Sequence, residues 1–284
     1  MFLTAVLYIM KTFYLGPDGS FSGLALNRAI ELMNVSESER IDAGENSNII
    51  PLLRDNHGSL AVAAMHTDAE GRVEDLFRSL MRLLDTGAQI SIGAALVTPI
   101  QFTLMGRRGI NLGNAKGVVA HKKGLGACPR MVEALLNSEE VTSNSRAALL
   151  VATEERFGDW LALASLGCAE KFGLEVIAEN VSNEPAVTTF YVFGNGLKLP
   201  KLKSGCWRLL SFVDLLDVPG SLHELTGAVK EHNSLYIHSI HKDAKNYRFV
   251  IEIEFGDEET ALVAAEKISR ATLKAMSFAF PVLS

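Results

Sequence analysis

Residues 161–194 read LALASLGCAEKFGLEVIAENVSNEPAVTTFYVFG and combine two kinds of apolar spacing. Apolar residues at helical spacing predict a helix over residues 160–172. Residues 175–178 and 188–193 are short apolar runs of the kind that forms strands. This stretch therefore predicts a helix followed by two strands.

The same alternation of strands and helices extends upstream to the start of the chain. Expected strands lie at residues 13–15, 59–65, 89–98, 101–104 and 117–121, and expected helices lie at residues 21–33, 73–84, 129–136 and 146–154. Strands that alternate with helices form a parallel or mixed sheet with helices on its faces. The first 195 residues are therefore expected to form an α/β domain.

The pattern changes after residue 195. Residues 196–205 are rich in Gly, Lys and Pro, which is typical of a linker. Beyond them the expected order is a strand (207–215), a helix (222–229), two strands (236–240 and 247–255), a helix (258–273) and a strand (275–281). The order βαββαβ predicts a ferredoxin-like domain over residues 206–284.

Composition restricts the possible functions. The chain has 284 residues, a formal net charge of -6 and 48% hydrophobic residues, which is ordinary for a globular protein. The negative charge argues against a nucleic-acid partner, and no apolar run approaches the ~20 residues that span a membrane. The apolar N-terminus lacks a basic region, so a signal peptide is not expected and the three cysteines are expected to be reduced in the cytoplasm.

Four motifs carry a family resemblance. YLGPDGSFS (residues 14–22), VAHKKGLGACPRMVEALL (119–136), SNSRAA (143–148) and the stretch 161–194 occur in the order found in the prephenate dehydratase catalytic domain. DVPGSLHEL (217–225) resembles the turn that opens the first helix of an ACT domain. The resemblance implies a two-lobed catalytic domain like a type II periplasmic binding protein (1–195), a linker (196–205) and a ferredoxin-like ACT domain (206–284). It also implies prephenate as the small-molecule substrate, with no cofactor and no metal.

The resemblance places the site in several segments. It implies substrate-binding roles for Gly19, Ser20, Phe21, Thr67, Ser143, Asn144, Ser145, Thr189 and Phe190, and catalytic roles for His66, Asp68 and Thr188. Residue types alone also allow plainer roles: His66 as a solvated loop residue, Ser20 as a helix cap and Thr188 as a strand residue.

Several of these positions depart from the family pattern. Thr189 stands where the family has an arginine, Ala186 where it has an asparagine and Asn144 where it has a threonine. His66, Thr67 and Asp68 stand where the family has Glu-Asn-Ser. Dehydration requires a donor that protonates the leaving hydroxyl and cations that hold a dianion. The lost arginine therefore favours non-aromatising decarboxylation of prephenate, with His66 as a cation held by a neighbouring carboxylate such as Asp68 or Glu70. Dehydratase activity and a catalytically inactive binding protein remain the alternatives.

The second domain resembles a regulatory unit. The resemblance implies an amino-acid effector site that includes Gly220, Ser221, Leu222 and His238. The acid and the arginine that the family uses in its second effector motif are missing from residues 238–241, so phenylalanine feedback is not expected. Pairing of edge strands across a twofold axis would make a homodimer or a homotetramer.

Overall fold

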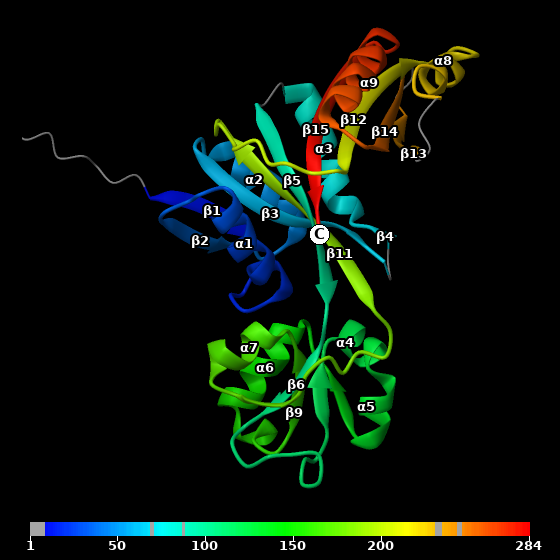
Figure 1. Cartoon of the computed structure of the whole chain (residues 1–284). Coiled ribbons are helices and arrows are strands. Elements are labelled where there is room, and N and C mark those ends of the chain that lie inside the picture. Colours follow the sequence, from blue (N-terminus) through cyan, green and yellow to red (C-terminus); the bar gives the residue numbers. More distant parts are fainter. Residues whose placement is uncertain (1–8, 69–70, 87–88, 231–234, 243–245) are drawn as a thin grey trace, which may run out of the picture.

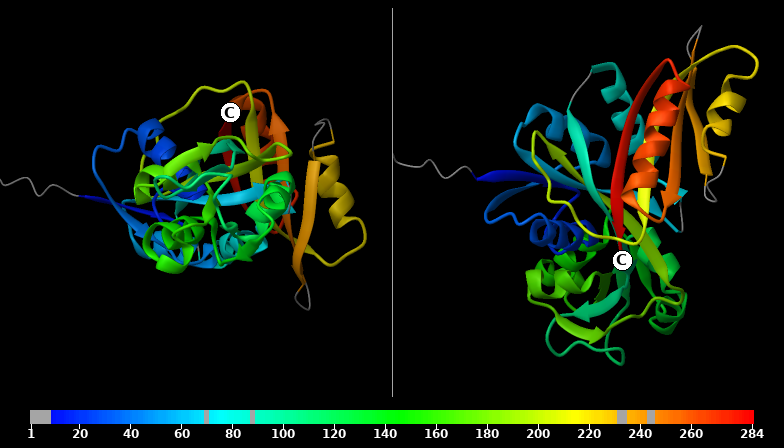
Figure 2. Two further views of the ribbon diagram at one scale, coloured as in Figure 1. Left: turned by 90° about the horizontal axis from the view of Figure 1, so that it is seen from below. Right: turned by 45° about the horizontal axis from the view of Figure 1, so that its top comes forward.

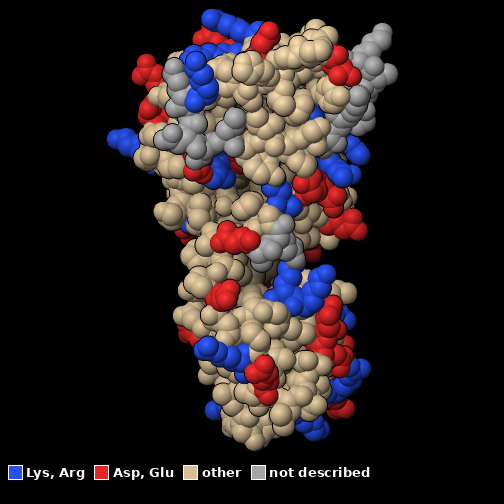
Figure 3. Space-filling view, turned by 90° about the vertical axis from the view of Figure 1, so that its right-hand side faces the viewer, with Lys and Arg blue, Asp and Glu red and all other residues tan. Residues whose placement is uncertain are grey.

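A computed structural model describes residues 9–68, 71–86, 89–230, 235–242 and 246–284. Figure 1 shows an upper body, a lower lobe joined to it by two long strands, and a C-terminal unit beside the upper body. Figure 3 shows that the surface narrows between the upper body and the lower lobe, and that basic and acidic side chains are interspersed on this face.

The upper body is formed by two separate parts of the chain. Its elements are β1 (Met10–Tyr14), α1 (Phe21–Leu32), β2 (Ser38–Asp42), α2 (Asn46–Asp55), β3 (Ser59–Thr67), β4 (Gly71–Arg72), α3 (Glu74–Thr86), β5 (Ile90–Ile100) and β11 (Ala186–Asn195). β5 leaves this body and β11 returns to it as antiparallel neighbours, so these two strands connect the lobes (Figure 1).

The lower lobe is a five-stranded sheet with helices. Its elements are β6 (Thr103–Gly106), β7 (Val118–Ala120), α4 (Lys122–Ala127), α5 (Pro129–Ala134), β8 (Ser138–Glu140), α6 (Asn144–Thr153), the short 3-10 helix Glu155–Phe157, β9 (Leu161–Ala164), α7 (Leu166–Phe172) and β10 (Glu175–Ala178). The strand order is β10-β6-β9-β7-β8, with β7 parallel to both β8 and β9.

The C-terminal unit has the expected βαββαβ order. Its elements are β12 (Trp207–Leu216), α8 (Ser221–Gly227), β13 (Leu235–Lys242), β14 (Asn246–Phe255), α9 (Glu258–Arg270) and β15 (Lys274–Leu283). The antiparallel order β13-β14-β12-β15 is the ferredoxin-like plan. Helices α8 and α9 cover one face, where Leu225, Ala261 and Ile268 are buried. The other face packs on the upper body through Phe212, Val250 and Phe280.

The C-terminal unit and the upper body share one sheet. The end of β15 pairs in parallel with β5, which joins the strands into a ten-stranded sheet of order β13-β14-β12-β15-β5-β11-β3-β1-β2, with β4 beside β3. Figure 2 shows β15 running down beside the upper body toward the lower lobe. Residues 196–206 contain no helix or strand, and Leu197, Leu199 and Leu202 pack against the hydrophobic cluster beneath α1.

The structure corrects one expected element and adds several, namely β2, α2, β4, α4, β8 and the 3-10 helix. The helix expected at residues 160–172 is the strand β9 followed by α7, because all four residues of LALA are buried between β6 and β7. A short apolar run has the same spacing in a buried strand and in a helix. Strand β2 and helix α2 were not predicted, since β2 is a polar edge strand without an alternating apolar pattern. Among the described residues, no helix combines the length and apolar character that a bilayer crossing requires.

Candidate functional site at the junction of the two lobes

The carboxyl ends of the parallel strands meet where the lobes join. In the lower lobe, β7, β8 and β9 run in the same direction and are followed by α4, α6 and α7. In the upper body, β1 is followed by the turn at residues 15–20 and by α1. In open α/β sheets, ligands bind outside the carboxyl ends of the strands, where the first turns of helices offer free N–H groups.

The turn at residues 15–20 contacts the lower lobe directly. The Ser165 hydroxyl donates to the carbonyl oxygen of Gly19, and the Cys168 thiol donates to the same oxygen at 3.3 Å. The rings of Phe21 and Phe102 meet edge to face, with centroids 5.3 Å apart. Gly19 has a φ of +85°, and a Cβ there would lie 2.8 Å from the carbonyl oxygen of Gly167. The close approach and the positive φ both require glycine.

The predicted residues 143–145 lie at the start of α6, beside this contact. Ser143 is the N-cap, and its hydroxyl accepts from the backbone N–H of Arg146 at 3.1 Å. Asn144 Oδ1 accepts from the backbone N–H of His121 at 2.9 Å, which ties α6 to the start of α4. Ser145 is buried, and its Oγ lies 3.7 Å from the Cys168 sulfur.

Ser20 caps α1 on the other side of the junction. Its hydroxyl accepts from the backbone N–H of Gly23 at 3.1 Å and donates to the carbonyl oxygen of Leu15 at 3.3 Å. The turn is further held by Asp18, which accepts from the hydroxyl of Tyr14 at 2.8 Å. The first turns of α1 and α6 therefore approach the same junction.

Three threonines lie side by side where β5 and β11 pass toward the lower lobe. Thr188 on β11 is paired with Thr67 on β3 and with Thr98 on β5. Side chains of directly paired residues share one face of a sheet. This face also carries Phe190, two residues further along β11, which is buried in the cluster beneath α1. The three hydroxyl-bearing residues therefore continue that face beyond the core of the upper body.

Thr98 is one of four described residues with a buried side-chain polar atom that lacks a hydrogen-bond partner; the others are Asn46, Arg72 and Arg208. Thr98 Oγ1 is shielded from solvent and has no hydrogen-bond partner among the described residues. Buried hydroxyls nearly always have a partner, and leaving one without costs about 1–3 kcal/mol. Thr188 is also buried, with 7% of its surface exposed. The hydroxyls of Thr98 and Thr188 therefore lie on one face near the lobe junction, and that of Thr98 has hydrogen-bonding capacity that the described residues leave unused.

A β-bulge turns His66 to the opposite face. Thr189 is paired with His66 and Phe190 with Ala64, so Met65 is an extra residue on β3. A bulge places two successive side chains of one strand opposite a single residue of its neighbour. His66 consequently shares a face with Thr189 and lines a cavity against the C-terminal unit. The structure therefore does not bring His66 and Thr189 together with Thr188.

The other predicted residues have structural contacts. Asp68 is exposed at the end of β3, and its carboxylate accepts from the backbone N–H of Val187 at 3.1 Å. In the C-terminal unit, Gly220 precedes α8 with a φ of +95°, and Ser221 donates to the carbonyl oxygen of Val218 at 3.1 Å. Leu222 is exposed on α8, whereas His238 Nε2 lies 3.7 Å from Glu74 Oε1 of the upper body.

Sequence reasoning missed Thr98, Ser165 and Cys168. Cys168 was interpreted only as a buried thiol, and residues 160–172 were expected to form one helix. The available signal was position, because Ser165 directly follows the buried strand β9 and so lies at its carboxyl end. Thr98 carried no signal in the sequence, since nothing local shows which residues will be paired with Thr188.

A two-lobed α/β fold, with the carboxyl ends of both sets of parallel strands facing one junction, defines a class of small-ligand proteins. The family profile of prephenate dehydratase matches residues 12–196. The chain belongs to the prephenate dehydratase family.

Individual relatives agree with this assignment. The prephenate dehydratase of Mycolicibacterium vanbaalenii is 28% identical over 220 residues, which cover 74% of this chain and 69% of that protein. The prephenate dehydratase of Arthrobacter aurescens, solved in complex with L-Phe, matches with a TM-score of 0.76 at 21% identity over 96% of this chain and 90% of that one. A protein described as GqqA, a novel type of quorum quenching acylase, matches with a TM-score of 0.77 at 21% identity over 96% of this chain and 97% of its own. At these identities the two structures show a shared fold.

Proposed function

We propose that this protein is a lyase that acts on prephenate at the junction of its lobes, and that its product keeps the ring hydroxyl. The observation that carries this proposal is the row of Thr67, Thr188 and Thr98 on one face of the connecting strands. The bond between the ring and its carboxylate breaks, carbon dioxide leaves, and the electron pair passes into the ring diene. A proton from water then adds to a ring carbon, so the product is a dihydro-4-hydroxyphenylpyruvate.

Threonine hydroxyls favour retention of the ring hydroxyl. A dehydratase must protonate this group as it leaves, and the efficient donors are groups whose pKa lies near the working pH. A threonine hydroxyl is not such a group, but it can donate and accept a hydrogen bond. Thr98 Oγ1 and Thr188 are therefore assigned to hold the ring hydroxyl in place. We assign no proton transfer to His66, because it lies on the opposite face of the sheet.

The two carboxylates of prephenate need positive partners. The first turns of α1 and α6 offer backbone N–H groups and the positive ends of two helix dipoles. The backbone N–H of His121, at the start of α4, donates to Asn144, and the exposed Lys122 and Lys123 follow it as the basic residues proposed for the lower-lobe side. These groups can hold a dianion without the arginine that is absent from position 189.

Dehydration to phenylpyruvate is the second candidate, and His121 is the observation that favours it. His121 is at the carboxyl end of β7, and its backbone N–H is bound by Asn144. An imidazole changes charge near neutral pH and could protonate a leaving hydroxyl. The curated relatives are prephenate dehydratases, which also supports this reading.

Incubation of the purified protein with prephenate separates the two candidates. Loss of prephenate without phenylpyruvate, which absorbs strongly as an enolate in base, supports decarboxylation. Phenylpyruvate formed at the rate of prephenate loss would overturn it in favour of dehydration, and replacement of His121 by Gln should then abolish that rate. Binding of prephenate without any turnover would identify an inactive binding protein.

Two isosteric variants test the threonine row itself. Thr98→Val should leave the free energy of unfolding unchanged or raised, because the hydroxyl it removes has no partner among the described residues. The same variant should lower kcat/KM about tenfold, the loss of one hydrogen bond of ~1.4 kcal/mol. Thr188→Val should lower it by about ten- to a hundredfold, because we place this hydroxyl, which can both donate and accept a hydrogen bond, in the centre of the row. Unchanged kinetics in both variants would remove the row from the site.

The C-terminal unit is proposed to be a regulatory ACT domain. Its βαββαβ order supports this, and the Arthrobacter protein of similar fold was solved with L-Phe. Gly220, Ser221, Leu222 and His238 remain the residues proposed for an amino-acid effector. Calorimetric titration with L-Phe tests this assignment, and the missing charged pair at residues 238–241 predicts weak or absent binding.

A further inference from the structure

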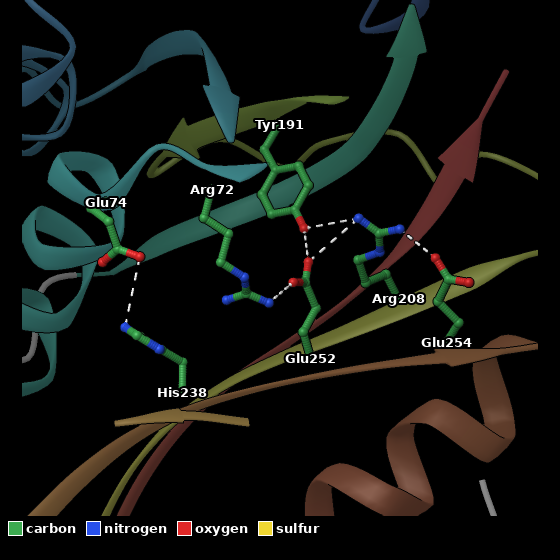
Figure 4. A network of polar contacts seen from close by, with 7 residues as sticks. All are labelled: Arg72, Glu74, Tyr191, Arg208, His238, Glu252 and Glu254. Atoms are coloured by element: carbon green, nitrogen blue, oxygen red, sulfur yellow. Dashed lines mark hydrogen bonds and ion pairs between the residues drawn. The ribbon is translucent and has the colours of Figure 1, made fainter. Parts of the chain in front are cut away.

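A buried network of charges joins the C-terminal unit to β11 and β4, on the face of the sheet opposite the threonine row. Glu252 on β14 is at its centre, and its side chain is 15% exposed. One carboxylate oxygen accepts from the hydroxyl of Tyr191 on β11, and the other is paired with Arg72 on β4. Figure 4 shows both arms converging on this carboxylate. A single side chain of the C-terminal unit therefore contacts β11 and β4, which lie on either side of this end of β3.

Tyr191 and Arg72, the two partners of the Glu252 carboxylate, each lie within a few residues of the threonine row. Tyr191 lies three positions after Thr188 on the same strand and is 1% exposed. Arg72 is paired with His66 across the β3–β4 hairpin, next to Thr67. The backbone N–H of Asp68 donates to the carbonyl oxygen of Val187 at 3.0 Å, which closes the pairing at this end of β3. A shift of either strand would change the spacing of Thr67 and Thr188.

Further contacts surround the network, although Arg72 Nη1 and Arg208 Nε are buried without a hydrogen-bond partner among the described residues. Arg208 on β12 lies 3.3 Å from the hydroxyl of Tyr191 and 3.4 Å from Glu252, and it is also paired with Glu254. The guanidinium of Arg72 lies between two rings, 4.7 Å from the centroid of Phe77 and 3.5 Å from that of Tyr236, and only 7% of its side chain is exposed. Removing one partner from such a buried group of charges leaves another charge without compensation.

We propose that Glu252 is a positioning residue that fixes the spacing of β3 and β11 and thereby the geometry of the threonine row. This inference rests on the proposed function, because it concerns the same site. The carboxylate acts through Tyr191 and Arg72 and does not touch the substrate. It belongs to the C-terminal unit, so any movement of that unit against the upper body would reach the site through this carboxylate.

The test uses two variants that keep the shape of the network. Glu252→Gln retains an acceptor for Tyr191 but loses the charge that pairs with Arg72. Tyr191→Phe removes the hydroxyl and keeps the ring. Each is expected to lower kcat/KM for prephenate at least tenfold, mainly through kcat. The kcat/KM of the double variant is expected to be nearly that of the less active single variant, because both changes act through one carboxylate.

Asp85→Asn is the matched control. Asp85, at the end of α3, accepts two hydrogen bonds of 2.8 Å from Arg248 on β14. It therefore joins the same two parts of the molecule, but at a place away from β3 and β11. This variant is expected to lower the unfolding temperature, yet to leave kcat/KM within twofold of the wild type. If Glu252→Gln and Asp85→Asn lower kcat/KM equally at equal stability, the network is only structural and the proposal is overturned.

Hydrogen exchange separates this proposal from the proposed function. The backbone amides of Asp68 and of residues 186–190 should exchange at least tenfold faster in Glu252→Gln than in the wild type, and at the wild-type rate in Asp85→Asn. This result is independent of turnover, so a wild type that does not consume prephenate overturns the proposed function alone. Wild-type exchange and kinetics in both Glu252→Gln and Tyr191→Phe would overturn the positioning role.

Discussion

Replacement of Gly19 by alanine tests the contact between the lobes. Gly19 has a φ of +85°, and an added Cβ would lie 2.8 Å from the carbonyl oxygen of Gly167 and 3.0 Å from its carbon. These are backbone atoms, so they cannot turn aside as the end of a flexible side chain could. The variant must either shift α7 or separate the turn from the lower lobe.

Two terms add to the expected loss of stability. A left-handed backbone conformation at a residue with a Cβ costs about 1–2 kcal/mol. Overpacking against neighbours that cannot move costs about 1–3 kcal/mol more. The free energy of unfolding should therefore fall by about 2–5 kcal/mol in Gly19→Ala.

Gly109→Ala isolates the first term. Gly109 has the same φ of +85°, but nothing lies within 4 Å of the Cβ position. This control should lose only about 1–2 kcal/mol. Urea unfolding at neutral pH measures both variants, and the difference between them is the cost of the contact between the lobes. Because Gly19 precedes Ser20 and Phe21, only Gly19→Ala should also lower kcat/KM. Equal losses of stability in the two variants would refute the reasoning.

Two pH-dependent predictions follow from buried or paired groups. Burial raises the pKa of the Cys128 thiol to about 11 in the folded protein, whereas the pKa of a thiol in an unfolded chain is about 8.5. The buried neutral thiol therefore contributes fully to stability below pH ~8.5. Above that pH its contribution to the free energy of unfolding should fall by up to about 1.4 kcal/mol per pH unit. Unfolding curves of Cys128→Ala should lack this fall. Partial burial alone would raise the pKa of Asp18, but hydrogen bonds from Tyr14 and Arg40 lower it. Asp18→Asn should thus destabilise the protein above about pH 4 and lose this effect as the pH falls further; an equal destabilisation at pH 7 and pH 3 would contradict this assignment.

The sequence predicted the order of strands and helices better than it predicted on which face of a strand each side chain lies. The order of strands and helices follows from local spacing, so the α/β part and the βαββαβ part were both expected. The exception was β9, whose four residues LALA are buried on both faces and therefore have no period of their own. The polar edge strand β2 was missed for the opposite reason, because few of its side chains are buried.

The candidate site was predicted in part. Ser20, Phe21 and residues 143–145 lie at helix starts beside the lobe junction, where the motifs placed them. Simple alternation along β3 would put His66 on the face of Ala64, toward the threonines. The extra residue Met65 reverses this, and it brings Thr67 to that face instead. A bulge depends on the pairing of two strands that are far apart in the chain, so no local pattern reveals it.

The sequence by itself determined the family, the order of most elements and the turns that open α1 and α6, because these depend on neighbouring residues. Only the tertiary structure decided which side chains meet: Thr98 beside Thr188, Cys168 against Gly19, and Glu252 against Tyr191 and Arg72. The physical reason is that each of these contacts is fixed by strand register and by the packing of separate units. Such contacts are set by the whole fold and not by the residues on either side of each partner.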